Sequence, residues 1–496
     1  MKMRKSWISA MILILGAMAA AGAVAAAAER TPLPPPVLKA VAYDLDFRFD
    51  YEAEKLFAEC RLTVLNPSQA PVDKIPMILY RLLKVTSVSD EKGEAVPFVQ
   101  RIAAFEDWDR MQVNFLEVTP RRIPASDRRI LIIKYEGYLA GYADAGMLYV
   151  KDSVKRDFTI VRQDCLAYPE IGILSWEANR AAGMPAFDYL LKVTVPDDLV
   201  AANGGRLVDA VSKGGLTTYA YRNIKTAWRM DVAVAPYKII EDKAANLKVF
   251  HFPEDAAGAE AVSKAAAAAK SLFSGWFGRL KEDRGFTIIE VPEGFGSQSD
   301  VTSILQTRTA FKDKSEMTQV YHEVAHIWDA RPLDPAPCRV ESEGVAMLLQ
   351  YVAREKLDAD AGALDRGAER IRESFRKACR SNPKAADTPI IEYGKADMTD
   401  LSYTKGMLFF YMIYKGAGEG PFLDALGRVR AKAGRSGTTT GEFLDSLQIF
   451  LKRDLSGLFE DWITGAASSR ALLSETPLAD IVKIYFPDVP RVPAGS

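Results

Sequence analysis

The residues best suited to chemistry lie in the segment His322-Glu323-Val324-Ala325-His326. On a helix, side chains four positions apart share one face, so His322 and His326 can bind a single metal ion. Glu323 can then contact a metal-bound water molecule as a general base. The only other histidine, His251, is distant in the sequence, and histidine is too scarce here for chance to explain the pair easily. Two histidines that merely share a helix face are the competing interpretation.

A catalytic zinc site usually has three protein ligands, so the motif needs one more donor. We expect this donor to be Glu343, which sixteen residues separate from His326. Glu341 is an alternative, but positions two apart point in different directions on a helix, so only one can face the metal. The prolines of segment 331–337 end the first helix, and a second helix then runs to about Leu357. A solvated surface carboxylate is the competing interpretation for Glu343.

The elements that must position these residues change in character along the chain. Segment 30–240 has recurrent apolar and β-branched runs between turn residues, which predict a β-sandwich or a related all-β domain. Segment 245–475 is mainly helical, with a short strand over 286–291. Residues 476–496 are rich in proline and predict a C-terminal tail that is a loosely attached strand or coil. The predicted class is therefore α+β with several domains.

Length and charge limit the classes of partner. A chain of 496 residues is too long for one ordinary core. Its formal net charge of −1 gives no indication of a nucleic-acid partner. A basic start followed by an apolar, alanine-rich run predicts a signal peptide over 1–28, hence export to the periplasm or the medium. The alternative is an uncleaved segment that tethers the protein to a membrane.

The four cysteines leave two possibilities open. An oxidising compartment permits disulfides, and Cys338 with Cys379 is the pair within one predicted domain. Four buried free thiols are the other possibility.

Several segments around the metal motif resemble the membrane alanyl aminopeptidase family, the zinc gluzincins that include leukotriene hydrolase. Glu343-Gly344 takes the place of the family's Glu-Gly after the His-Glu-x-x-His motif, in a segment two residues shorter than usual. Segment 402–406 resembles the family's Tyr-x-Lys-Gly, which implies that Tyr403 donates to the oxyanion of the tetrahedral intermediate. A tyrosine that simply packs in a helix is its competing interpretation. The resemblance extends over most of 40–470 and implies an N-terminal antiparallel β-sandwich followed by a thermolysin-like catalytic domain with one Zn²⁺. On this resemblance, we expect the protein to lack the family's large helical C-terminal domain.

One departure concerns how the family recognises its substrates. The family binds the free amino group of a peptide through a Gly-x-Met-Glu-Asn strand, and the matching stretch here contains Gly296 and Gln298. Gln298 stands where the family has glutamate, and a neutral amide cannot offset the charge of an ammonium group. The resemblance thus implies a peptidase of peptide or protein substrates in which recognition of the N-terminus is altered. The alternative is an inactive relative that keeps zinc and acts as an exported binding protein.

Overall fold

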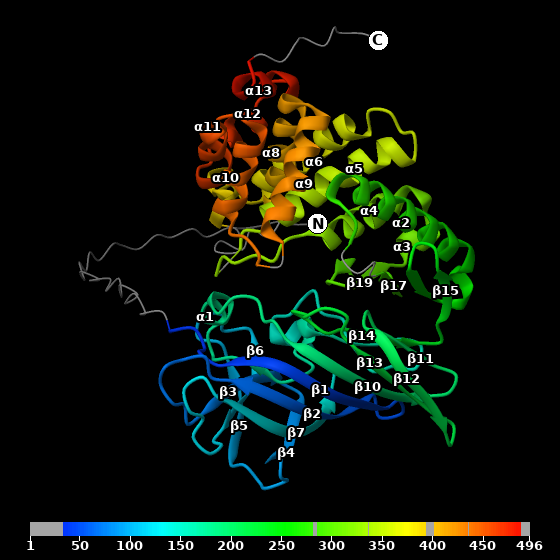
Figure 1. Ribbon diagram of the computed structural model, residues 1–496. Coiled ribbons are helices and arrows are strands. Elements are labelled where there is room, and N and C mark those ends of the chain that lie inside the picture. The colour runs from blue at the N-terminus through cyan, green and yellow to red at the C-terminus, as the bar shows by residue number, and fades with distance from the viewer. Residues whose placement is uncertain (1–32, 281–284, 336, 393–400, 435, 488–496) are drawn as a thin grey trace, which may run out of the picture. The chain divides into compact units, whose positions relative to one another are not determined.

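The computed structural model describes residues 33–280, 285–335, 337–392, 401–434 and 436–487, and strands dominate its first half (Figure 1). The predicted signal peptide lies outside the described residues. In β2, every second side chain from Leu56 to Val64 is buried, as expected of a strand with one face on a core. The strands of the largest sheet run in the order β12-β13-β10-β1-β2-β7-β4. Their bounds are β1 (Lys39–Asp50), β2 (Lys55–Leu65), β4 (Leu83–Asp90), β7 (Arg128–Tyr138), β10 (Asp188–Pro196), β12 (Arg206–Lys213) and β13 (Leu216–Arg222).

A second sheet shares the core of this first one. Its order is β5-β6-β3-β9, and one apolar cluster joins Leu62 of the large sheet to Leu116 of the small one. Its strands are β3 (Ile75–Tyr80), β5 (Phe98–Ala104), β6 (Gln112–Val118) and β9 (Glu170–Ile171). The arrangement differs from a purely antiparallel one, because β1 and β10 pair in parallel. A parallel pair needs a long crossover, which the chain between these two strands supplies.

Two smaller sheets follow. The first has the order β11-β14-β8, and the second has the order β15-β16-β17-β19-β18. The strand predicted over 286–291 is β17, which pairs in parallel with β16 and β19 and is buried throughout. The bounds are β8 (Thr159–Val161), β11 (Val200–Ala202), β14 (Val232–Ala235), β15 (Lys238–Asp242), β16 (Leu247–His251), β17 (Phe286–Val291), β18 (Gln298–Ser299) and β19 (Ser303–Thr307).

Helices form most of the remaining chain, which confirms the α+β class. Phe273 of α2, Val324 of α4, Leu348 of α5 and Phe410 of α8 belong to one apolar core. The longer helices are α2 (Ala256–Phe277), α4 (Met317–Ala325), α5 (Val345–Leu357), α6 (Ala363–Ser381), α8 (Leu401–Ala417), α9 (Glu419–Ala433), α10 (Thr440–Leu451) and α13 (Leu478–Tyr485). Short ones are α1 (Trp176–Ala181), α3 (Thr309–Lys312), α7 (Lys384–Asp387), α11 (Ser456–Phe459) and α12 (Ser468–Leu473). None of the described helices combines the length and apolar character needed to cross a bilayer.

The C-terminal tail and the cysteines differ in part from what the sequence predicted. The described part of the predicted tail, 476–487, is no loose strand or coil, because α13 occupies most of it and packs on α8. Residues 488–496 of the predicted tail lie outside the described residues. The physical reason is apolar burial, since Ile481, Val482 and Phe486 are all buried. The four cysteines are free and buried, so the predicted disulfide alternative, Cys338 with Cys379, is not formed.

Candidate metal centre

The two histidines of the motif meet at the end of a short, buried helix. His322 lies in α4, and the helix tightens into a 3₁₀ turn from His326 to Trp328. The first helix, which the prolines of segment 331–337 were expected to end, therefore ends earlier as regular α-helix. The Nε2 atoms of the two imidazoles are 3.1 Å apart. Their spacing brings two nitrogen donors to one point, as the sequence predicts.

Glu343 supplies the third group from a different element. It lies in a π-helical turn, Val340–Gly344, directly before α5. Its Oε2 is 3.3 Å from His322 Nε2 and 3.4 Å from His326 Nε2, and no hydrogen-bond donor of the described residues satisfies it. Its Oε1 contacts the guanidinium of Arg339. The sequence-predicted ligand group therefore comes together, with one atom from each residue within 4.8 Å of the others.

This donor set fits a zinc ion. Zinc takes histidine nitrogen and carboxylate oxygen in four-coordinate sites, and catalytic sites leave one position open. A buried carboxylate oxygen with no donor is costly unless something compensates its charge, and a cation between the three atoms would do so. Burial, with the neighbouring His326, lowers the pKa of His322 to about 4. His322 is thus a neutral imidazole, the form that binds metals.

The alternative carboxylate faces elsewhere. Both carboxylate oxygens of Glu341 are 3.3 Å from the hydroxyl of Thr440, in α10. Burial raises the pKa of Glu341 to about 7. Among the described residues, Glu341 is absent from the group that can hold a metal ion. Of the two carboxylates that the sequence left as candidates, the structure brings Glu343 to the histidines.

Glu323 is buried beside the ligands without joining them. The hydroxyl of Ser299, in the edge strand β18, donates to Glu323 Oε2 at 2.6 Å and also contacts the Glu323 carbonyl at 2.9 Å. One carboxylate oxygen is thereby held in place. Among the described residues, the group that could hold a metal ion does not include Glu323.

Tyr403 comes from the first turn of α8 and lies over the same centre. Its ring is nearly parallel to that of His322, with centroids 6.3 Å apart. The guanidinium of Arg339 lies 6.0 Å from the Tyr403 ring centroid. The tyrosine predicted from the family segment is therefore close to the histidines, and Arg339 is an additional cation that the sequence did not indicate.

The two predicted substrate-binding residues lie at the edge of the five-stranded sheet. Gln298 is in β18, and Arg162 Nη1 donates to Gln298 Oε1 at 3.5 Å. Gly296 precedes it, and a Cβ atom added there would meet no other atom within 4 Å. Asp164 also forms a hydrogen bond with Gln298. Burial acts to raise the pKa of Asp164, but the charges of Arg229 and Arg162 outweigh it, and the pKa is lowered. Gln298 is thus part of a network with two charged residues of the β-rich half of the chain, Arg162 and Asp164.

Sequence reasoning missed the residues that support the ligands. Asp329 Oδ2 is 2.7 Å from His326 Nδ1, and the hydroxyl of Ser342 donates to the same oxygen at 2.7 Å. Asp329 lies three positions after its histidine, a spacing that could have indicated the contact. Ser342 directly precedes Glu343, whereas nothing in the sequence points to Ser299. Asp329 contacts His326, Ser342 contacts Asp329, and Ser299 contacts Glu323, in each case by a hydrogen bond.

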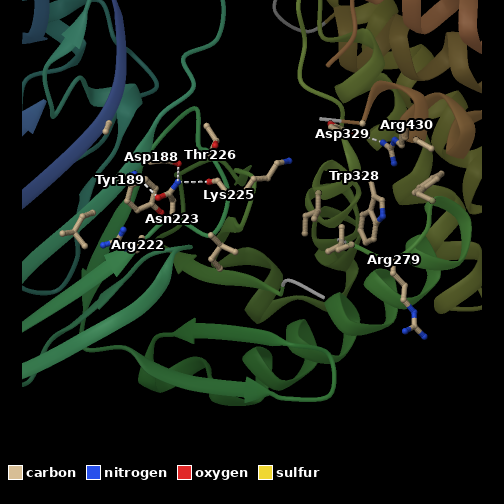
Figure 2. Close-up of a pocket in the computed structure, with 18 of the residues that line it drawn as sticks. Asp188, Tyr189, Arg222, Asn223, Lys225, Thr226, Arg279, Trp328, Asp329 and Arg430 are labelled. Carbon is tan, nitrogen blue, oxygen red and sulfur yellow. Dashed lines mark hydrogen bonds and ion pairs between the residues drawn. The ribbon is translucent and has the colours of Figure 1, made fainter. Parts of the chain in front are cut away.

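A cleft of about 930 Å³ adjoins the metal centre on the side of Asp329 (Figure 2). Trp328, Asp329 and Arg430 lie on one side of it, and Asp188 and Lys225 lie on the other. The cleft therefore reaches the residue that contacts His326 Nδ1, although the metal ligands themselves do not line it.

Fold and site together define a class: an α+β protein with a His-Glu-x-x-His helix and a distant glutamate. No protein-family model and no curated protein matches the sequence. Solved structures do match. A crystal structure of the M1 zinc metallopeptidase from Deinococcus radiodurans is 16% identical, with a TM-score of 0.61, over 89% of this chain and 94% of that one. A mutant of an M1 zinc metallopeptidase from the same organism, bound to a Tyr-Ser-Ala substrate, is 17% identical, with a TM-score of 0.61, over 86% and 94%. The chain thus has the fold of these metallopeptidases.

Proposed function

We propose that the protein is a zinc-dependent metallopeptidase that hydrolyses peptide bonds. The observation that carries this proposal is the unsatisfied Glu343 Oε2 opposite two imidazole Nε2 atoms, beside the buried carboxylate of Glu323. Two nitrogens and one carboxylate oxygen leave a fourth position free, as catalysis requires. The fold likeness to M1 zinc metallopeptidases supports the same conclusion.

Each residue then has a chemical role. His322, His326 and Glu343 would hold a zinc ion, which would supply a Lewis acid for the scissile carbonyl and for the attacking water. Glu323 accepts a proton from the attacking water and passes it to the leaving amine, so its second oxygen must face the substrate. Ser299 fixes the first oxygen by its hydrogen bond. Tyr403 donates to the oxyanion, where charge develops in the transition state.

We further propose that recognition of the peptide N-terminus is altered. Gln298 carries no charge, and its side-chain oxygen already faces the guanidinium of Arg162. The nearby carboxylate of Asp164 is paired with Arg229 and Arg162. A free ammonium group would find no unpaired carboxylate in this network, and the neighbouring guanidinium would repel it. Peptides with a blocked N-terminus should therefore be accepted about as well as free ones.

Zinc analysis with a matched peptide pair tests both proposals. Tyr-Ser-Ala, the peptide bound in the structural neighbour, serves as the free probe, and its N-acetylated form serves as the blocked one. Internally quenched longer peptides extend the pair. Stoichiometric zinc and cleavage that stops when a chelator removes zinc are the expected results. Bound zinc without cleavage of any peptide would instead favour the binding protein.

The variant Gln298→Glu examines N-terminal recognition directly. It restores the charge that the family uses, in a side chain of nearly equal size. We expect the ratio of kcat/KM for free over acetylated peptide to rise in the variant. A strong preference of the unaltered protein for the free peptide would contradict altered recognition without affecting the assignment as a peptidase.

Export is proposed from the predicted signal peptide over 1–28. N-terminal sequencing of the protein recovered from the periplasm or medium tests it, with a new N-terminus near residue 28 as the expected result. Recovery of full-length protein in the membrane fraction would favour the tether.

A further inference from the structure

The Nδ1 atom of His326 contacts the carboxylate of Asp329, and both oxygens of this carboxylate have hydrogen-bond partners. Asp329 Oδ2 faces His326 Nδ1 at 2.7 Å and accepts the Ser342 hydroxyl at 2.7 Å. Asp329 Oδ1 accepts from Arg430 Nη2 at 2.8 Å. Because both oxygens are engaged from separate directions, the carboxylate cannot rotate without breaking a charge-assisted hydrogen bond.

Arg430 is itself fixed by the fold. It comes from α9, 101 residues from Asp329, and its side chain is only 4% exposed. Its guanidinium stacks on the ring of Phe277 at 4.4 Å, and the two charged groups face each other in the cleft wall (Figure 2). A buried aspartate without such a partner would carry a large desolvation cost. Arg430 thus allows a charged Asp329 to stay in place.

We propose that Asp329, held by Arg430, is the positioning residue that fixes the ring orientation and tautomer of His326 for metal binding. This inference rests on the proposed zinc function. An imidazole whose Nδ1–H donates to a carboxylate presents the lone pair of Nε2 to the metal and is a stronger base. His322 lacks this support, because its Nδ1 has no hydrogen-bond partner among the described residues. The centre therefore depends on one oriented histidine.

The cleft offers matched control variants. Asp188 lines the same cleft, and its carboxylate accepts from Asn223 at 2.8 Å rather than from a residue of the metal centre. Arg222 lines the cleft as well and can control for changes at Arg430. Zinc affinity of the purified full chain is measured by competition with a chromophoric chelator. The variants are Asp329→Ala, Asp329→Asn and Arg430→Met, with Asp188→Asn and Arg222→Met as controls.

We expect Asp329→Ala to weaken zinc binding about 10- to 100-fold, the usual effect of losing such a partner. Asp329→Asn keeps an acceptor oxygen without charge and should lose less. Arg430→Met should weaken zinc binding in the same direction, and Arg430→Lys should restore part of it. Both controls should bind zinc as the unaltered protein does. Excess zinc should restore most of kcat in Asp329→Ala with little change in KM, which a loss of fold would not allow.

Each result is decisive. Zinc affinity unchanged in folded Asp329→Ala would overturn the positioning role while leaving the peptidase proposal intact. Should Asp329→Ala not fold, the nearly isosteric Asp329→Asn and the Arg430 variants carry the test, and unchanged affinity in all of them has the same consequence. An unaltered protein that takes up no zinc would remove the proposed function, and the positioning role with it.

Discussion

Replacing Glu323 by glutamine separates catalysis from metal binding. The change keeps the size of a side chain that is almost fully buried, and one of its oxygens can still accept from the Ser299 hydroxyl, now 2.6 Å away. What is lost is the capacity to take a proton. Because Glu323 lies outside the described group of ligands, zinc should remain bound at the level of the unaltered protein.

The expected size of the effect follows from the role of the residue. A positioned general base contributes about 10²- to 10⁴-fold to the rate. At about 1.4 kcal/mol per tenfold change, kcat should fall by an amount equivalent to about 3–5 kcal/mol. KM should change little, because the proposed role of Glu323 is to transfer a proton in the transition state and not to hold the substrate.

The assay is cleavage of a quenched peptide, measured with zinc content on the same samples. Glu341→Gln is the matched control, since Glu341 is also a buried carboxylate but faces Thr440. It should keep its zinc and most of its activity. Full activity in Glu323→Gln, with zinc bound, would refute the assignment of Glu323 as base.

Three further changes test other parts of the structure. Tyr403→Phe should lower kcat about 10²- to 10³-fold, as loss of an oxyanion donor does, with KM nearly unchanged in the same peptide assay. Gly344→Ala should destabilise the fold by about 1–3 kcal/mol in urea unfolding, because its Cβ would lie 2.8 Å from the Gly406 backbone, whereas Gly420→Ala meets nothing and should not destabilise. Burial raises the pKa of Glu290 from 4.5 to about 9, so the unfolded chain loses this proton at lower pH than the folded protein, and stability falls as pH rises through that interval. The free energy of unfolding of Glu290→Gln should therefore rise relative to that of the unaltered protein from pH 5 to 8, by at most about 1.4 kcal/mol per pH unit. A difference between the two proteins that stays constant with pH would contradict the pKa shift.

Local patterns in the sequence were sufficient for the elements they encode. The strand predicted over 286–291 is β17, and the second helix ends at Leu357 as predicted. Thr439 and Glu442 form a capping box before α10. These features depend on contacts within a few residues, so periodicity and capping chemistry reveal them. The prediction for the C-terminal tail was wrong over α13, because the burial of Phe486 against Gly416, in α8, is a long-range contact.

The sequence by itself determined the pair His322 and His326, because a helix of fixed pitch places them together whatever surrounds it. Only the tertiary structure decided which glutamate joins them. Glu341 and Glu343 differ by two positions, and the π-helical turn in which both lie brings Glu343 to the histidines and leaves Glu341 facing Thr440. The pairing of Asp329 with Arg430 was likewise beyond local reasoning. It joins residues 101 positions apart, and such a contact exists only once the helices have packed.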